Sequence, residues 1–441
     1  MFFNSPEYIA FFVLFFAVFA LTNNKKCLRT RNFLFLMASY WFYARLHLWF
    51  VVLLGYITIV NYFCGIWIFN ARQRGENGKH AVTAAIVMSL LVLAFFKYAY
   101  LIKATILLPV GLSFFTFQAL TYTIDVYRGK IEAEKDFLTV ALFVAFFPTL
   151  LSGPIERARN LFPQLKRPTK INWESITEGA GLFIWGLFKK VVIADRLAQF
   201  VNQAYLFPSS QSGSTLALAA VFYSFQIYCD FSGYADMAVG SGRVLGFAIM
   251  PNFNFPYCVR TVKEFWRRWH ISLTSWFTEY VYISMGGNRV KKWRWLVNIS
   301  TVFLLSGIWH GATWSFILWG AIHACLYLGE YYLGPERPNL LYHILVFSMV
   351  TLAWIFFRIP DSSVAFAIIG KIGTDLFSPV HWGSSMFSTL LTICLLMVFV
   401  VREYLLYKGT LPRKYAVEYV ALILAICLFG VSSDQFVYFQ F

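Results

Sequence analysis

The chain alternates between long apolar stretches and short polar connections over almost its whole length. The stretches that suit spanning or re-entrant helices lie at about 8–22, 33–46, 47–69, 81–102, 106–126, 137–152, 179–200, 215–238, 296–309, 312–333, 340–358, 386–401 and 416–432. Several are shorter than the roughly 20 residues that a helix needs to cross a bilayer at right angles. We therefore predict an all-α, polytopic integral membrane protein with about eleven transmembrane helices, the other stretches being re-entrant or interfacial. No polar block could house a soluble domain, so residues 1–441 are expected to form a single transmembrane domain.

Composition and charge agree with this prediction. Charged residues make up only 13% of the chain, whereas a soluble domain carries about 25%. The net charge of +16 comes from basic residues that fall mostly between apolar stretches, as in 25–31, 70–80 and 154–170. This distribution is typical of cytoplasmic loops and predicts an N-terminus outside the membrane, with 8–22 a retained first span and not a cleaved leader. It also argues against a nucleic-acid partner, which needs a basic soluble platform.

Glycine and proline interrupt two of the apolar stretches, at 108–113 and 151–157. Backbone that leaves the helix at membrane depth must be buried in protein or line a water-filled cavity. The two breaks therefore indicate a hollow protein with a cavity inside the membrane.

Residues 261–274 read as one amphipathic helix. At about 100° per residue, Lys263, Arg267 and His270 fall within about 60° of one another with Thr274, and aromatic residues occupy another side. One interpretation is a helix that lies in the membrane interface with its basic face toward anionic headgroups. The other is a cationic entrance for an anionic substrate, with His270 deeper along the stripe.

His310 lies in an apolar stretch, with no acidic or basic residue between Arg294 and Glu330. Ionisable residues at bilayer depth are costly and usually face a cavity with a function. A histidine can stay neutral there, and its ordinary pKa of about 6.5 suits proton transfer near neutral pH. The alternative is a core histidine that makes one hydrogen bond to a carbonyl.

Other polar residues indicate structure more than chemistry. Asp230 and Asp236 are expected to pair with a cation such as Arg243 or Arg267, or to bond within the bundle. His323 lies about 220° round a straight helix from His310, a poor arrangement for a metal site. Seven cysteines without a CxxC motif indicate neither a disulfide framework nor zinc. No metal is expected.

The most informative stretches, taken in order, resemble the membrane-bound O-acyltransferase family. They lie at 108–129, 146–165, 228–247, 252–276 and 306–320, and the likeness covers essentially the whole chain. It is strongest to the bacterial branch of alginate O-acetyltransferase membrane subunits. The resemblance implies a ring of helices around a central tunnel, in the plasma (inner) membrane of a bacterium.

The resemblance also implies roles for particular residues. The family's histidine in the Trp-His-Gly motif matches His310, and its second histidine matches His270, so both are expected to be catalytic. Five further residues are expected to bind substrate: Lys263, Arg267, Arg268, Asn288 and Trp309. The acyl donor would be a cytoplasmic thioester, acetyl-CoA or an acyl carrier protein, with no permanently bound cofactor. A periplasmic serine-hydrolase-like acetyltransferase is the expected partner.

Two rival hypotheses remain open. One keeps the enzyme and changes the substrate, to D-alanyl transfer or the acylation of a lipid. The other is a non-enzymatic polysaccharide or lipid transporter that uses the same cavity. Transporters often show internal repeats, and none stands out in this sequence.

Overall fold

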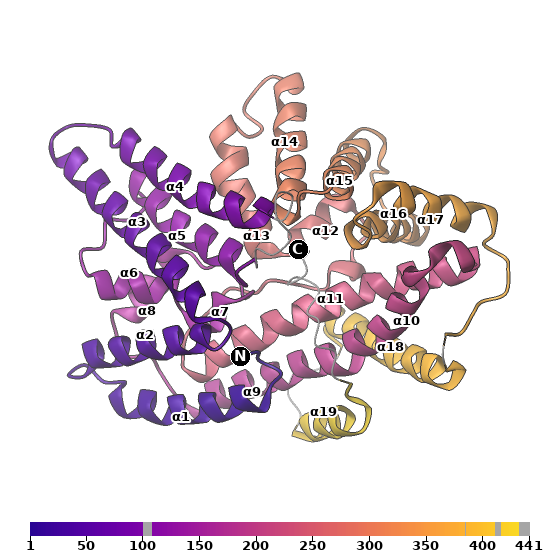
Figure 1. Cartoon of the computed structure of the whole chain (residues 1–441), viewed down its shortest axis with the longest axis horizontal. Coiled ribbons are helices and arrows are strands. Elements are labelled where there is room, and N and C mark those ends of the chain that lie inside the picture. The colour runs from indigo at the N-terminus through magenta and orange to yellow at the C-terminus, as the bar shows by residue number, and fades with distance from the viewer. Residues whose placement is uncertain (100–107, 384, 411–415, 432–441) are drawn as a thin grey trace. The chain divides into compact units, whose positions relative to one another are not determined.

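The structure is a computed structural model that describes residues 1–99, 108–383, 385–410 and 416–431 (Figure 1). Every regular element in this part of the chain is a helix, as predicted. The ends of the predicted stretches at 100–102, 106–107 and 432 lie outside the described residues. Two compact units can be distinguished, residues 1–183 with 234–251, and residues 184–233 with 252–441.

The first unit is built from the N-terminal helices. Its helices are α1 (Pro6–Thr22), α2 (Leu28–Ala44), α3 (Leu48–Gln73), α4 (Lys79–Tyr98), α5 (Leu112–Tyr127), α6 (Phe137–Val144), α7 (Phe147–Leu150) and α8 (Ala158–Leu165). Two further helices have residues in both units, α9 (Trp173–Phe188) and α11 (Gly213–Val244).

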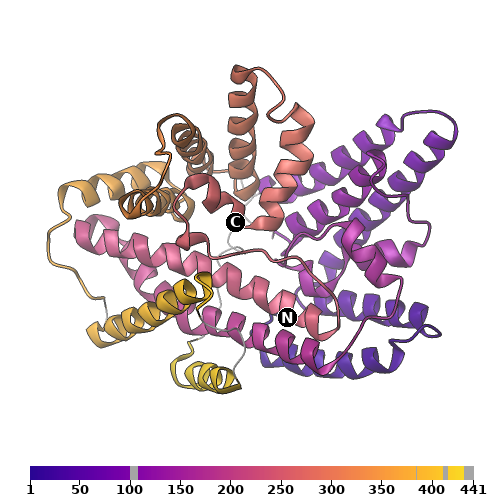
Figure 2. The same ribbon diagram turned by 180° about the vertical axis from the view of Figure 1, so that it is seen from behind.

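The second unit contains the remaining elements, shown from pink through orange to yellow in Figures 1 and 2. Its helices are α10 (Asp195–Leu206), α12 (Val262–Arg268), α13 (Ile271–Phe277), α14 (Lys292–His310), α15 (Trp314–Leu333), α16 (Leu340–Arg358), α17 (Ser362–Thr374), α18 (Met386–Tyr407) and α19 (Ala416–Phe429). Short π and 3₁₀ segments complete it, at Lys189–Ala194, Pro208–Ser210, Pro256–Cys258, Thr278–Tyr282 and Ile283–Met285.

Among the residues that the structure describes, four helices are long and apolar enough to cross a membrane: α3, α4, α16 and α18. Only 28–44% of the residues in their most apolar windows are buried within the chain. The apolar remainder faces outward, as expected of a surface in contact with lipid. Shorter apolar helices, α1 among them, add to these four. The described residues therefore support a membrane protein, but they do not confirm the predicted count of eleven spans.

Both predicted helix breaks lie in the first unit, the one at 151–157 buried and the one at 108–113 partly buried. Residues 151–158 are buried throughout, and Gly111 has a left-handed backbone with φ of 80°. A Cβ at Gly111 would lie 2.5 Å from the carbonyl oxygen of Leu150. Only glycine suits such a close approach at positive φ, so the two breaks pack against each other.

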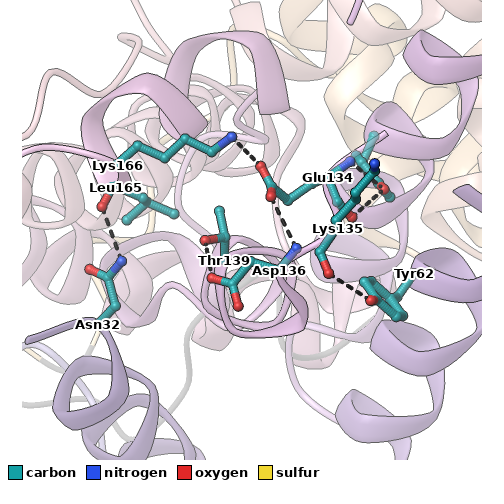
Figure 3. Close-up of polar contacts among 9 residues, drawn as sticks. Asn32, Tyr62, Glu134, Lys135, Asp136, Thr139, Leu165 and Lys166 are labelled. Carbon is teal, nitrogen blue, oxygen red and sulfur yellow. Dashed lines mark hydrogen bonds and ion pairs between the residues drawn. The ribbon is translucent and has the colours of Figure 1, made fainter. Parts of the chain in front are cut away.

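Polar contacts in the first unit fix the connection before α6 (Figure 3). Glu134 pairs with Lys166, and its carboxylate accepts a hydrogen bond of 3.1 Å from the Asp136 amide. Tyr62 on α3 donates to the carbonyl of Lys135 at 2.8 Å. Lys166 is one of the basic residues that the sequence assigns to loops, and it also has this structural partner.

Buried arginines correct part of the charge prediction. Arg31 lies in α2, only 1% exposed, and donates to the carbonyls of Leu165 and Arg167 at 2.8 and 2.9 Å. Arg157 is likewise buried, with 2% of its surface exposed. These two arginines stabilise the fold and contribute little to a basic loop surface.

Helices α14 and α15 pack closely through glycines. A Cβ at Gly307 would lie 2.3 Å from the carbonyl oxygen of Phe316, and one at Gly320 would lie 2.5 Å from that of Phe303. Small residues allow two backbones to approach in this way, as is common between membrane helices. The contact positions His310, three residues beyond Gly307.

We expect Gly307→Ala to destabilise the protein because the new methyl group forces α14 away from α15. Overpacking of this kind costs about 1–3 kcal/mol. Thermal unfolding of the purified protein in detergent measures the loss. Gly329→Ala on α15 is the matched control, since a Cβ there meets nothing within 4 Å. Equal melting temperatures for the two variants would contradict the packing argument.

Candidate active site

His270 and His310 line the same cavity of about 270 Å³ in the second unit. We call it the histidine cavity. Both rings are buried, with 2% and 4% of the residue exposed. Helices α12 to α15 contribute further residues to its lining, including Lys263, Trp266, Arg267, Thr274, Ser306 and Tyr327. The fold thus brings together two histidines that are 40 positions apart in the sequence.

The backbone breaks at His270, which corrects the prediction of one helix over 261–274. α12 ends at Arg268 and α13 begins at Ile271. His270 between them has φ of 43° and ψ of 54°, in the left-handed region. A residue with a side chain is strained there, by about 1–3 kcal/mol, and such strain clusters at functional sites.

Asn252 holds this break in place. Its carbonyl accepts a hydrogen bond of 2.8 Å from the Ile271 amide. Its side-chain oxygen accepts from the amide and hydroxyl of Ser272 at 3.1 and 2.9 Å. The same oxygen lies 3.0 Å from Nδ1 of His270.

The Asn252 contact defines the tautomer of His270. An amide oxygen can only accept, so Nδ1 must donate the proton of that hydrogen bond. In the neutral ring, which a buried position favours, Nε2 then has the lone pair. His270 is therefore prepared to accept a proton or a hydrogen bond at Nε2.

His310 occupies the last position of α14. Aromatic rings surround it, with centroid distances of 4.7 Å to Trp309, 5.2 Å to Trp319 and 4.8 Å to Phe357. The Trp309 ring also lies 6.2 Å from the ring of His270. These contacts hold the imidazole in a water-poor environment while it lines the cavity.

A second, more polar pocket of about 820 Å³ adjoins the histidine cavity. We call it the vestibule. Lys263, Tyr282 and Tyr327 line both spaces, and Asn288 lines the vestibule. The two spaces share these three lining residues, so the vestibule lies directly beside the cavity that the histidines line.

Glu330 lines the vestibule and holds the start of α12 in place. Its carboxylate accepts hydrogen bonds of 2.6 and 3.0 Å from the amides of Val262 and Lys263, at the start of α12. Thr261 caps the same end, accepting from the Glu264 amide at 3.0 Å. These contacts anchor α12 to α15 and direct Lys263 and Arg267 into the cavity wall.

The five predicted substrate-binding residues differ in their placement. Lys263 and Arg267 line the histidine cavity, and Asn288 lines the vestibule. Trp309 packs beside both histidines. Arg268 does not reach the cavity, since its guanidinium pairs with Glu264 at 2.9 Å and lies 5.2 Å from the centre of the Tyr407 ring.

Sequence reasoning missed Asn252, Glu330 and the two tyrosines of the shared wall. Asn252 opens the matching stretch 252–276, which is the one available signal for it. The others lie 12 residues or more from either histidine along the chain, and only the fold brings them near.

Reversing the charge of Arg267 tests whether the cations of the cavity lining attract an anionic donor. Both Lys263 and Arg267 are exposed, and no acidic side chain is among the described residues that line the histidine cavity. We expect Arg267→Glu to raise the KM for the thioester donor that the resemblance implies roughly tenfold or more, since a charged hydrogen bond contributes about 1.5–3 kcal/mol. The value of kcat should stay within about twofold, because the chemistry lies deeper. Steady-state kinetics measure both constants, and Arg294→Glu at an exposed position is the control. An Arg267→Glu variant with the KM of the unmodified protein would support the interfacial-helix interpretation.

Asp230 pairs with neither of the cations suggested by the sequence. Its carboxylate lies 2.6 Å from Nζ of Lys190, which also lies 2.8 Å from Asp195. Lys190 is in a π-helical segment, and the pairs are buried. Arg243 instead pairs with Glu178 at 3.3 Å. For Asp230 the expected structural pairing is confirmed, but the partner is Lys190 and neither Arg243 nor Arg267.

His323 is buried apart from the cavity lining. Its ring lies 4.9 Å from those of Trp266 and Trp319. Among the described residues, no group of three or more histidine, cysteine, aspartate or glutamate side chains is arranged to hold a metal ion.

The fold is helical with apolar helices long enough to span a membrane, and one buried cavity is lined by two histidines. Comparison with known families gives the class of protein. Residues 35–335 match the model of MBOAT, the membrane-bound O-acyltransferase family. The chain belongs to this family. It is an O-acyltransferase.

Named relatives refine this assignment. The chain is 38% identical to the probable alginate O-acetylase AlgI of Azotobacter vinelandii, over 80% of this chain and 74% of the relative. It is 33% identical to the peptidoglycan O-acetyltransferase of Helicobacter pylori, over 86% and 81%. A teichoic acid D-alanyltransferase of Bacillus subtilis is 31% identical over 49% of this chain and 57% of its own length.

Proposed function

We propose that this protein transfers an acetyl group from a cytoplasmic thioester to a hydroxyl on the other side of the membrane, for the O-acetylation of an extracellular or periplasmic polysaccharide such as alginate. The single observation that supports it best is the joint placement of His270, His310 and two cations on one cavity. The relatives named for alginate and peptidoglycan acetylation support the acetyl group and the acceptor class.

The chemistry needs one base and an oriented pair of substrates. His310 takes the proton of the acceptor hydroxyl as its oxygen attacks the thioester carbonyl. The new carbon–oxygen bond forms, the carbon–sulfur bond breaks, and the proton returns from His310 to the departing thiolate, giving an ester and a thiol. General acid–base assistance of this kind contributes about 10²–10⁴-fold.

His270 has a positioning role in this proposal. Because Asn252 keeps the proton on Nδ1, Nε2 accepts a hydrogen bond from a second O–H or N–H group of the acceptor, since the single proton of the reacting hydroxyl goes to His310, and this bond holds the acceptor in line. A neutral ring in this tautomer has no proton at Nε2 to offer the thioester carbonyl. The geometry therefore favours the acceptor over the donor as the group that His270 holds.

The donor enters through the vestibule. Lys263 and Arg267 attract the phosphates of acetyl-CoA or the phosphopantetheine of an acyl carrier protein. Asn288 contributes a polar group to the vestibule wall, and the Trp309 ring packs against the rings of His270 and His310. The narrow, buried cavity keeps water from the thioester.

The same proposal includes the membrane location, the orientation and the partner protein. The protein is a multi-pass protein of a bacterial plasma (inner) membrane with its N-terminus outside, and about eleven spans surround a central tunnel. The exposed basic residues Lys25, Lys26 and Arg29, with those at 70–80, support this orientation. A periplasmic serine-hydrolase-like acetyltransferase receives the acetyl group and passes it to the polysaccharide.

D-alanyl transfer is a second candidate, supported by the match to a D-alanyltransferase over 49% of the chain. An acetyl group is uncharged, whereas the ammonium of a D-alanyl group would meet Lys263 and Arg267 as like charges. Acetyl transfer therefore fits the cavity better.

Radiolabelled acyl thioesters test the function. The full chain is reconstituted in vesicles and supplied with acetyl-CoA, acetylated carrier protein, D-alanylated carrier protein or palmitoyl-CoA. We expect label on a polysaccharide hydroxyl or the partner protein from the acetyl donors only. D-alanyl or palmitoyl transfer would replace the substrate in the proposal, and movement of polysaccharide without transfer from any thioester would overturn it.

A further inference from the structure

An apolar groove of about 600 Å³ lies between α16 and α18 of the second unit. Its depth is aromatic and aliphatic, including Phe225, Phe347 and Phe399. Ligand pockets typically measure about 300–1,000 Å³. The volume and lining suit a hydrocarbon chain.

Both helices that flank the groove are long enough to span a membrane, and their outer faces are apolar and exposed. Leu340, Ile344 and Val401 are 70%, 52% and 53% exposed. The groove lies among such residues, on a lipid-facing part of the second unit. A membrane lipid can therefore reach it without crossing water.

One end of the groove is cationic. It is lined there by Arg260, before α12, and Lys408, just after α18, with His343 in the first turn of α16. Arg260 donates to the carbonyl of Pro338 at 3.0 Å, one of the five N–H groups of a guanidinium. The Lys408 ammonium lies 5.6 Å and 5.9 Å from the ring centres of Tyr404 and Tyr407. Both cations are exposed and line the same groove, so both are accessible to an anionic headgroup.

Glu403 is the acidic residue of the lining. Its carboxylate accepts a hydrogen bond of 2.6 Å from the hydroxyl of Tyr228, and the residue is only 7% exposed. Its charge is thus directed inward, away from the exposed Arg260 and Lys408.

We propose that this groove binds an anionic membrane phospholipid, with its phosphate between Arg260 and Lys408 and an acyl chain along the aromatic depth. The site differs from the histidine cavity and shares no lining residue with it. The cationic end of the apolar groove favours a lipid with an anionic headgroup over one with a zwitterionic headgroup.

The bound lipid would also support the catalytic region. Tyr257 in the groove wall accepts a hydrogen bond of 3.1 Å from the indole of Trp354. Its ring lies 5.9 Å from that of Trp269, the residue before His270. A filled groove therefore stabilises the aromatic layer behind the strained turn at His270.

Lipid titration followed by native mass spectrometry tests the proposal. The purified full chain in detergent is titrated with phosphatidylglycerol or phosphatidylcholine. We expect phosphatidylglycerol to bind at least tenfold more tightly and to raise the melting temperature further, as a ligand of the native state does. The double variant Arg260→Gln/Lys408→Gln should weaken phosphatidylglycerol binding roughly 30-fold, since each basic residue near an anionic surface contributes about 1 kcal/mol. It should leave phosphatidylcholine binding unchanged.

Two matched variants locate the site. Lys25→Gln/Lys26→Gln removes the same charge from exposed positions in the first unit and should change nothing. Ile344→Trp fills the groove from an exposed position and should weaken both lipids. Equal affinity for the two lipids, a preference that survives the double charge variant, or lipid binding unaffected by Ile344→Trp would each overturn the proposal. Because binding is measured without acyl transfer, a failure here leaves the proposed enzyme function standing, and the reverse also holds.

Discussion

Replacing His310 by alanine is expected to abolish acyl transfer. In the proposed mechanism this imidazole takes the proton of the acceptor hydroxyl and returns it to the leaving thiolate. Loss of the base should lower kcat by about 10²–10⁴-fold. Initial rates of label transfer from acetyl-CoA in reconstituted vesicles measure the effect.

A second substitution separates chemistry from packing at this position. The His310 ring contacts Trp319 and Phe357, so an alanine also leaves space in the core. His310→Gln preserves most of the side-chain volume and still makes hydrogen bonds, but it cannot take up a proton near neutral pH. Both variants should be inactive, and the glutamine variant should melt near the temperature of the unmodified protein. Exposed His80→Ala is the matched control; an active glutamine variant would remove His310 from the mechanism.

The fold class could be read from the sequence because lipid imposes a strong rule on the backbone. Each spanning segment must satisfy its own hydrogen bonds, so apolar stretches become helices. The stretch at 340–358 coincides with α16 as Leu340–Arg358. The stretch at 137–152 divides into α6, buried from Thr139 onward, and α7, which is buried throughout. Apolarity alone does not distinguish a spanning helix from one buried in protein, which is why the count of spans stays open.

The site was predictable in its chemistry but not in its geometry. Helical periodicity placed Lys263 and Arg267 on one face, and both do line the cavity with His270. The same periodicity failed at His270 because Asn252, 18 positions earlier, binds the backbone on the far side of the break. A contact between distant segments leaves no periodic signal. The same reason explains why Lys190, and not Arg243 or Arg267, pairs with Asp230.

Replacing Asn252 by leucine is expected to reduce kcat by roughly 10²-fold while the KM for the thioester stays nearly unchanged. The leucine has a similar volume but no oxygen, so Nδ1 of His270 loses its acceptor and the ring is no longer held in one tautomer. Loss of orientation at a reacting group can cost about 10²-fold. The donor path through Lys263 and Tyr327 lies elsewhere on the cavity wall and should still bind thioester. Steady-state kinetics with acetyl-CoA separate the two constants.

Asn252→Asp is the matched variant that keeps the critical oxygen. The Asn252 amide nitrogen has no hydrogen-bond partner among the described residues, so its replacement by oxygen removes no contact that the structure shows. Aspartate still accepts from Nδ1 of His270 and from Ser272, and it should retain most of the activity that leucine loses. A purely structural role for Asn252 predicts instead that activity follows the melting temperature in both variants. A leucine variant as active as the unmodified protein would show that the Asn252 contact to Nδ1 of His270 is irrelevant to transfer.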